Sequence, residues 1–345
     1  MRIGIVSSAV PLVYGGGRFI VDWLNEKLTA RGHQVETVYL PFVEYQDQIL
    51  SQTAAFRMMK LDDYFEQVIT IRPPAHAVRH RRKVVWFIHH LRGFYDLWGT
   101  PYGAVPDHAA GRALRDAVMA ADNEFLSEAR HVFTNSRVVG DRLRRFNGVA
   151  SDILYPPILR PEMFVAGAYG DEIVSVCRME HHKRQHLMVE AMAHTRTAVR
   201  LRLCGLSMHP AYVEGLRRRA LELGVADRVT VEERWISEQE KADRLENALA
   251  SAYLPFDEDS YGYPTIEAAH AARCTVTVSD SGGVAEFVQD GVTGLMTGPD
   301  AAELGAAFDR LYADRALTAR MGAAARERVA ELGIDWDTTI ERLLA

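Results

Sequence analysis

Two carboxylates flank a polar turn in the second half of the chain. Asp259 begins the segment DSYGYPTIE and Glu267 ends it. Gly262 lets the backbone approach a ligand closely, and the N–H groups of the helix expected after it can face an oxyanion. A carboxylate accepts two hydrogen bonds at once. The pattern therefore favours a sugar or nucleotide ligand, with Glu267 holding paired hydroxyls such as those of ribose and Asp259 holding a sugar hydroxyl.

Two cations follow the strand EIVSVC at a spacing of five residues. Arg178 comes directly after this strand, and Lys183 lies at the expected start of the next helix, KRQHLMVEAMA. An arginine offers a planar fork and a lysine a point charge, so together they can bind a diphosphate. A pair of ordinary surface cations is the alternative.

A glycine triplet lies between the first strand and the first helix. Gly15, Gly16 and Gly17 precede a helix expected to begin near Arg18, and free N–H groups at a helix start can accept phosphate or sugar oxygens. The dinucleotide fingerprint G-x-G-x-x-G is not matched. A plain flexible turn is compatible with the same residues.

Adjacent histidines end the strand VVWFI. Of His89 and His90, only one can point away from the core, because successive side chains of a strand alternate. That side chain is expected either to donate or accept a hydrogen bond to a ligand or to be structural. A metal ligand is not indicated, since no second ligand lies at a suitable spacing.

Short β-branched runs alternate with helical patterns along the whole chain of 345 residues. They begin with RIGIVSS and QVETVYL, and the rhythm restarts at EIVSVCR after the proline pair at 156–157. Such alternation is typical of parallel, doubly wound sheets, in which ligands bind beyond the carboxyl ends of the strands. We predict an α/β protein with two Rossmann-like domains facing a central cleft, over residues 1–160 and 165–330, followed by a C-terminal helix at 331–345.

Charge is distributed unevenly between the two halves. Residues 1–160 carry +4 and residues 161–345 carry −10. The densest basic cluster is Arg79, Arg81, Arg82 and Lys83, which is interpreted as a solvated edge or as a contact with an anionic membrane surface. No apolar run is long enough to span a bilayer and no signal peptide is recognised, so a cytoplasmic location is expected. The three cysteines are far apart and predicted to be reduced.

Taken together, these motifs resemble those of retaining glycosyltransferases of family 4, which have the GT-B fold. DSYGYPTIE is similar to the family block E-G-F-G-L-x-x-x-E, with Asp259 in place of the first glutamate and Glu267 as the second. Arg178 and Lys183 match an Arg and a Lys five apart. FTNSRVVGDRL and VSDSGGVAEFVQDGVTGLM resemble other recurring blocks.

The resemblance implies a role for each matched position. It places Glu267 on the nucleotide ribose, Arg178 and Lys183 on the diphosphate, and His89 near the donor sugar from the acceptor side. Asp259, or Glu258 after a small shift of the turn, would act as the first acid. The remaining donor-binding positions are Gly15, Gly16, Gly17, Ser260, Tyr261, Gly262 and Tyr263. The C-terminal helix is expected to pack on the N-terminal domain.

The expected reaction is transfer of a hexose from a UDP- or GDP-linked sugar to a hydroxyl of a saccharide, glycolipid or small molecule, with retention of configuration. The resemblance most often implies polysaccharide or glycolipid assembly. It is also compatible with peripheral contact with the inner membrane. No nucleic-acid partner is indicated. No bound cofactor and no metal are expected, because cations and helix-start N–H groups can stabilise the leaving diphosphate. The alternatives are a nucleotide-sugar-binding protein without turnover, and a GT-B epimerase or phosphorylase.

Overall fold

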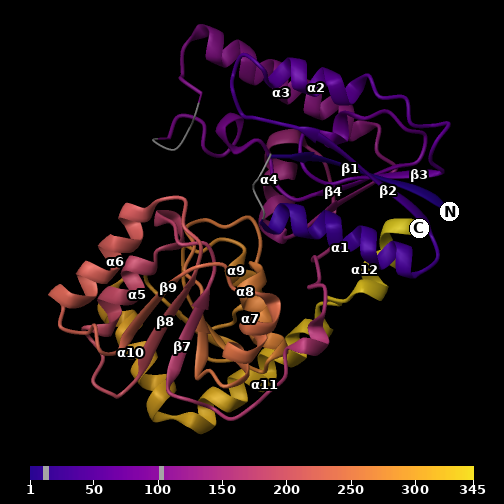
Figure 1. Cartoon of the computed structure of the whole chain (residues 1–345). Helices are drawn as coiled ribbons and strands as arrows, with labels where there is room; N and C mark the ends of the chain where they lie inside the picture. The colour runs from indigo at the N-terminus through magenta and orange to yellow at the C-terminus, as the bar shows by residue number, and fades with distance from the viewer. Residues whose placement is uncertain (11–14, 101–104) are drawn as a thin grey trace. The chain divides into compact units, whose positions relative to one another are not determined.

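The computed structural model describes residues 1–10, 15–100 and 105–345. The chain forms two compact units, one made of Met1–Pro156 with Trp336–Ala345 and the other of Pro157–Asp335. Each unit is an α/β sandwich around a parallel sheet, as Figure 1 shows, which confirms the predicted fold class.

The sheet of the N-terminal unit has the order β2-β1-β3-β4-β5-β6, with every pair parallel. Its strands are β1 (Arg2–Ala9), β2 (Gln34–Pro41), β3 (Gln67–Thr70), β4 (Lys83–Phe87), β5 (His131–Thr134) and β6 (Asp152–Ile153). Its helices are α1 (Gly16–Ala30), α2 (Ile49–Arg57), α3 (Ala109–Ser127), α4 (Arg137–Asn147) and α12 (Trp336–Leu344). β3 and β4 are buried along their whole length, as expected of central strands covered on both faces.

The sheet of the C-terminal unit has the order β12-β11-β10-β7-β8-β9 and is also parallel. Its strands are β7 (Glu172–Val176), β8 (Arg200–Gly205), β9 (Val229–Glu233), β10 (Ala250–Ala252), β11 (Thr275–Val278) and β12 (Gly294–Thr297). Its helices are α5 (Gln185–Met192), α6 (Pro210–Glu222), α7 (Glu238–Glu246), α8 (Tyr263–His270), α9 (Val284–Phe287), α10 (Ala301–Ala313) and α11 (Arg315–Glu331).

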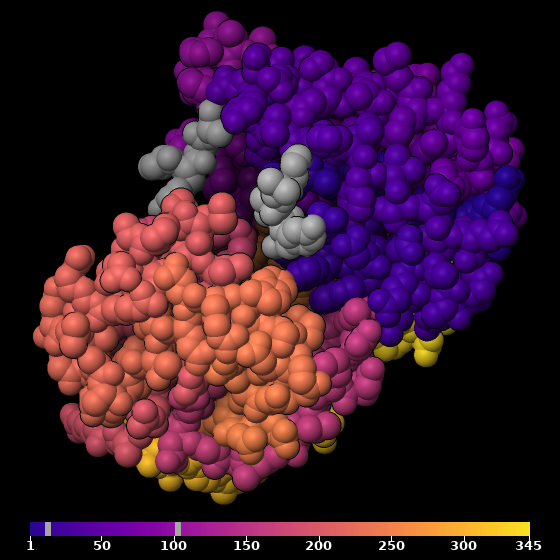
Figure 2. Space-filling view, viewed as in Figure 1, coloured from indigo at the N-terminus to yellow at the C-terminus, as the bar shows by residue number. Residues whose placement is uncertain are grey.

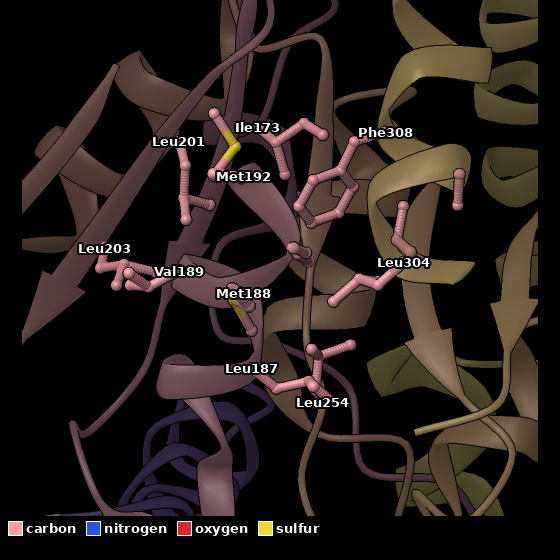
Figure 3. Packing of buried hydrophobic residues seen from close by; sticks show 14 of the residues in the cluster. Ile173, Leu187, Met188, Val189, Met192, Leu201, Leu203, Leu254, Leu304 and Phe308 are labelled. Atoms are coloured by element: carbon pink, nitrogen blue, oxygen red, sulfur yellow. The ribbon is translucent and has the colours of Figure 1, made fainter. Parts of the chain in front are cut away.

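The core of the C-terminal unit lies between its sheet and helices α5 and α10. Figure 3 shows Ile173 of β7 and Leu201 of β8 near Met192 of α5, with Leu304 and Phe308 reaching in from α10. All five side chains are fully buried. This packing holds rigid the strands whose carboxyl ends carry the candidate site.

The last helix belongs to the N-terminal unit. Gln67 Nε2 on β3 donates to the Leu343 carbonyl at 2.6 Å, and Arg342 donates to the Ile153 carbonyl of β6 at 2.7 Å. Trp336, Ile340 and Leu343 are buried. In Figure 2 the yellow end of the chain adjoins the indigo N-terminal residues.

One member of the predicted basic surface cluster is not on the surface. Lys83 is fully buried, and its ammonium donates to the carbonyls of His76 and Phe125 at 2.9 and 2.8 Å and pairs with Glu128 at 3.2 Å. The interpretation of Lys83 as part of a solvated or membrane-facing edge is therefore wrong. Lys83 is buried because it is the first residue of the central strand β4, and its side chain contacts Phe125 and Glu128 at the C-terminal end of α3.

No described helix has the length and apolar character needed to cross a bilayer.

Candidate active site

The loop from β10 to α8 is held in place by one arginine. Arg184 forms two hydrogen bonds to the Asp280 carboxylate, at 2.7 and 2.9 Å, and donates to the carbonyls of Leu254 and Pro255, each at 2.8 Å. A bidentate pair of this kind fixes orientation as well as distance. The backbone from 254 onward is thus tied to the loop that follows β11.

The same loop is hydrogen-bonded to the segment that contains Gly282 and Gly283, after β11. Gly283 N donates to the Glu258 carbonyl at 2.8 Å, and Gly282 pairs with Glu258 in an isolated parallel bridge. A Cβ at Gly282 would lie 2.4 Å from the Glu258 carbonyl oxygen, so this approach requires glycine. The segments DSYGYPTIE and DSGGVAEFV therefore build one structure.

Gly262 is the N-cap of α8, and its φ of +70° is a conformation that favours glycine. A Cβ there would lie 2.2 Å from a ring carbon of Tyr253. The helix begins at the next residue, Tyr263, and has Pro264 in its first turn. Pro264 has no N–H, and the Thr265 N–H donates to the Gly262 carbonyl at 3.1 Å, so this helix start offers an anion its positive dipole rather than a row of open N–H groups.

A buried cluster joins the ends of β7 and β10. Lys183 is 7% exposed, its ammonium donates to the Tyr253 hydroxyl at 2.8 Å, and it forms an ion pair with the Glu258 carboxylate. The Tyr253 hydroxyl also donates to Glu258, at 3.0 Å. Burial raises the pKa of Glu258, but the Lys183 charge and these hydrogen bonds outweigh it and hold the pKa below its ordinary value. Glu258 is thus ionised beside a cation at neutral pH.

Lys183 reaches this position from a segment that is less helical than predicted. Instead of one helix from Lys183 onward, a short 3₁₀ turn covers His181–Lys183, Arg184 adopts a left-handed conformation with φ of +54°, and α5 starts at Gln185. This break directs the Arg184 side chain toward the β10–α8 loop, and the helix therefore starts two residues later than predicted.

Arg178 lies at the carboxyl end of β7 with a half-exposed side chain. Its guanidinium donates to Glu180 at 2.7 Å. Behind it, a Cβ on Gly205 would lie 1.9 Å from the Cys177 carbonyl oxygen, so the ends of β7 and β8 pack backbone to backbone. The Arg178 guanidinium therefore lies at the edge of the sheet, and Glu180 fixes its orientation.

Glu267 is buried in the first turns of α8 and forms an ion pair with Lys241 of α7 at 2.6 Å. Burial raises the pKa of Glu267, although the Lys241 charge opposes this effect. Burial alone would lower the pKa of Lys241, but the carboxylates of Glu267 and Glu238 outweigh it and raise the pKa. Both groups are therefore held in a shared, nearly dry site.

Helix α7 presents Lys241 through a capping box. Ser237 Oγ accepts from the Glu240 N–H, while Glu240 accepts from the Ser237 N–H at 3.0 Å. Lys241, Tyr253 and Arg184 were not among the residues predicted from the sequence. The S-x-x-E signature before Lys241 was the available signal for α7, but nothing in its spacing relates that helix to Glu267.

The other predicted donor-binding positions continue the same loop. Asp259, Ser260 and Tyr261 lie between Glu258 and the helix start, with Tyr261 buried and Asp259 and Ser260 half-buried. The sequence places Asp257, Glu258 and Asp259 in a row. Even so, in the described part of the chain no group of three or more histidine, cysteine, aspartate or glutamate side chains is arranged to hold a metal ion.

The N-terminal unit holds the remaining predicted residues. Helix α1 starts at Gly16, two residues earlier than predicted, with Gly15 as its N-cap. Gly17 lies against Arg72, since a Cβ on Gly17 would be 3.2 Å from the Arg72 side chain. The early start follows from the helix hydrogen bonds that Arg18 and Phe19 donate to the Gly15 carbonyl.

His89 lies two residues beyond β4 and lines a cavity of about 340 Å³ in the N-terminal unit. Its Nδ1 is 2.7 Å from the His90 carbonyl oxygen. Burial lowers the pKa of His89, and the charge of Arg72 lowers it further. The imidazole is therefore neutral, and because a carbonyl only accepts, Nδ1 carries the proton and Nε2 is left as an acceptor.

Tyr95, Trp98 and Tyr102 are aromatic residues of the N-terminal half, and such side chains can either stack on a sugar ring or fill the core. Tyr95 is buried, and its hydroxyl donates to Asp122 at 2.6 Å, so it fills the core. Trp98 packs on the same apolar cluster, with the Arg115 guanidinium 5.1 Å from its ring centre. Tyr102 lies outside the described residues.

Part of the chain matches a known protein family. Residues 168–328 match the family described as "Glycosyl transferases group 1". The chain is 24% identical over 293 residues to alpha-1,3/1,6-mannosyltransferase ALG2 of Homo sapiens, covering 77% of this chain and 68% of that protein. It is 32% identical over 189 residues to a GDP-mannose-dependent alpha-(1-6)-phosphatidylinositol monomannoside mannosyltransferase of Mycolicibacterium smegmatis, covering 52% of this chain and 49% of that one.

Solved structures resemble the whole chain in fold. Sucrose-phosphate synthase from Thermosynechococcus elongatus superposes with a TM-score of 0.78 at 20% identity, covering 99% of this chain and 97% of that one. HepE of Anabaena, solved with UDP and glucose, superposes with a TM-score of 0.73 at 15% identity, covering 99% and 98%.

Proposed function

We propose that this chain, which has the GT-B fold, is a group 1 glycosyltransferase that moves a hexose from a nucleoside-diphosphate sugar to a hydroxyl acceptor with retention of configuration. The observation that carries the proposal is the cluster of Lys183, Glu258 and Tyr253 next to the glycine turn that starts α8. It joins a buried cation, an ionised carboxylate and the positive end of a helix at the carboxyl edge of a parallel sheet, where such sheets bind ligands.

Each group retains capacity for a substrate. An ammonium has three donors, and Lys183 uses two of them on Tyr253 and Glu258, so one is left for a phosphate oxygen. Among the described residues, Glu258 Oε1 has no hydrogen-bond partner, which leaves it for a sugar hydroxyl. Glu267 uses Oε1 on Lys241, and its Oε2 is proposed to accept from the ribose.

The chemistry we propose is electrostatic. As the bond from the sugar to the diphosphate breaks, negative charge grows on the leaving phosphate oxygen, and Arg178, Lys183 and the positive end of α8 stabilise it. The same oxygen accepts the proton of the acceptor hydroxyl, which attacks from the same face. Removal of one preorganised donor of this kind lowers the rate by a factor of about 10²–10³. His89, with its free Nε2, is proposed to hold a substrate hydroxyl.

The donor class is proposed from two directions. The mycobacterial relative is named as GDP-mannose-dependent, and the HepE structure contains UDP and glucose. Both fit a site that binds ribose and diphosphate through Glu267, Arg178 and Lys183. The acceptor is proposed to be a saccharide, a glycolipid or a small molecule, and turnover is proposed to be independent of metal ions.

The first test is thermal stabilisation by UDP, GDP and ADP, each with and without EDTA. A nucleotide at 100 times its dissociation constant adds about 2.7 kcal/mol to the free energy of unfolding. We expect a shift with one nucleotide that persists in EDTA, is reduced in Glu267→Gln and is unchanged in Glu327→Gln, an exposed acid on α11. Absence of a shift with every nucleotide would contradict the proposal, and a chelator that stopped turnover would contradict metal independence.

Turnover separates this proposal from its alternatives. Transfer or hydrolysis with any donor sugar would exclude a binding protein without activity. A phosphorylase of this fold would need pyridoxal phosphate on a lysine, and absorbance between about 300 and 450 nm reports it; the engagement of Lys183 with Glu258 and Tyr253 speaks against that lysine.

A further inference from the structure

The cavity beside His89 contains a cation that the proposed donor chemistry does not use. Arg72 follows β3, and the carboxyl ends of β1, β2, β3 and β4 all contribute to the cavity walls. The lining includes Ser8, Phe42, Glu44, Arg72, His89 and Leu91. A cavity at this edge of a parallel sheet is the expected position of a ligand.

Arg72 has no protein partner in the described part of the chain. Its Nε is buried without a hydrogen bond, and no carboxylate there lies within ion-pairing distance of its guanidinium. Burial lowers the pKa of Arg72, while the charges of Glu44 and Tyr39 oppose this shift. Arg72 is half-buried and its Nε lacks a hydrogen bond, so an anion supplied by a ligand in the cavity would complete its interactions.

The surroundings decide which kind of ligand fits. Glu44 faces the same cavity but is exposed, so its charge is screened by water more than that of Arg72. The side chains of Val10, Phe42 and Leu91 add apolar surface to the cavity lining. The neutral His89 imidazole offers Nε2 to a hydroxyl in the same space.

We propose that the acceptor carries an anionic group, a phosphate or a carboxylate, that binds the Arg72 guanidinium while a hydroxyl of the same molecule approaches His89. This inference rests on the proposed transferase function and narrows its acceptor to anionic molecules. The anion is borne either by a soluble sugar or by a lipid headgroup, since the guanidinium recognises the same oxygens in both.

The test compares matched ligands while the nucleotide site is saturated with whichever nucleoside diphosphate stabilises the protein. Glucose 6-phosphate, glucuronate and glucose share a ring and differ in the group at one carbon, and ligand-observed NMR titrations give their affinities. Vesicles of phosphatidylinositol in phosphatidylcholine, against phosphatidylcholine alone, supply the lipid arm by co-sedimentation. The proteins are wild type, Arg72→Gln, Arg72→Lys and the control Arg130→Gln, which removes an exposed charge from the same unit.

We expect at least one anionic probe to bind more tightly than its neutral counterpart by about tenfold or more, the size of one charge-assisted hydrogen bond. Arg72→Gln should abolish this preference, Arg72→Lys should restore part of it, and Arg130→Gln should leave it intact. Preference among the soluble sugars would identify a sugar acceptor, and preference confined to vesicles a lipid headgroup.

Equal binding of anionic and neutral probes in every arm, or a preference that survives Arg72→Gln, would overturn the assignment while nucleotide stabilisation leaves the transferase proposal standing. Nucleotide stabilisation in Arg72→Gln also shows that this variant is folded. If no nucleotide stabilises the wild type, the transferase proposal itself fails, and the acceptor assignment fails with it.

Discussion

At the scale of single residues, the C-terminal unit is notable for acids that are paired with buried lysines. Glu258 pairs with Lys183 and Glu267 with Lys241. In each pair one carboxylate oxygen is committed to the lysine, so the partner fixes how the other oxygen is presented. Pairing thus orients the groups that we propose to bind the donor.

Removal of Lys183 should expose the cost of an unpaired acid. Lys183→Ala is expected to lower the free energy of unfolding by about 2 kcal/mol, less than the about 3–5 kcal/mol typical of fully buried pairs, because the Glu258 side chain keeps 26% of its exposure. The Lys183→Ala, Glu258→Gln double variant should regain part of this loss. Urea unfolding at pH 7 measures both. Equal destabilisation in the single and double variants would show that the pair is not coupled.

Nucleotide affinity should depend on pH through Glu267. Burial holds the pKa of Glu267 above its usual 4.5, so this carboxylate gains its proton earlier than an exposed one as the pH falls. The protonated form is a poorer hydrogen-bond acceptor, and affinity should fall in mildly acidic solution. The diphosphate titrates in the same range for wild type and Glu267→Gln alike, so the difference between their calorimetric affinities across pH isolates Glu267. Parallel profiles would contradict the assignment.

At the scale of elements, the position of α8 depends on its start. The β10–α8 loop is fixed by Arg184, by the bridge to Gly282 and by the turn at Gly262. None of these contacts reaches a ligand. They determine where the positive end of α8 points, and therefore whether that end can bind an anion.

Gly262→Ala should break this start. The added Cβ meets the Tyr253 ring, and the φ of +70° is unfavourable for alanine, so we expect a loss of about 2 kcal/mol or more and loss of nucleotide stabilisation. The matched control is Gly215→Ala within α6, where no atom lies within 4 Å of the new Cβ and stability should rise by up to about 1 kcal/mol. Thermal unfolding with and without nucleotide compares them. A Gly262→Ala protein that still responds to nucleotide would exclude the α8 start as the anion site.

At the scale of the whole molecule, the chain returns at its end to the unit in which it began. Helix α12 contributes Trp336, Ile340 and Leu343 to the N-terminal unit, after the entire C-terminal unit has been completed. The N-terminal core is therefore made of segments that are distant in the sequence.

Leu343→Ala should destabilise the N-terminal unit selectively. Leu343 is fully buried, and removal of such a side chain costs about 2–5 kcal/mol. Hydrogen exchange should rise in β1, β3 and β4 and stay unchanged in β7 and β8. Phe308→Ala, within the C-terminal core, should produce the opposite pattern. Equal changes in both sheets after either substitution would mean that the two units unfold together.

Much of the architecture follows from local pattern alone. The alternation of β-branched runs with helical periods is a property of neighbouring residues, because strands and helices repeat every two and 3.6 residues, and it was sufficient to predict two parallel α/β sheets. The strand β12 carries little local signal because GLMT is short and not β-branched throughout, and the helix predicted to begin at Lys183 begins two residues later because no local signal marks the left-handed turn at Arg184.

The sequence by itself determined the fold class, the order of the elements and the residues at strand ends with the chemistry to bind a phosphorylated sugar. Only the tertiary structure decided their partners. Lys83 belongs to a basic run in the sequence, yet it is buried and contacts three acceptors. Glu267 forms an ion pair with Lys241. Among the described residues, the Nε of Arg72 has no hydrogen-bond partner in its cavity. The physical reason is that a side chain's burial and charge environment depend on contacts between segments far apart in the chain, which no local spacing encodes.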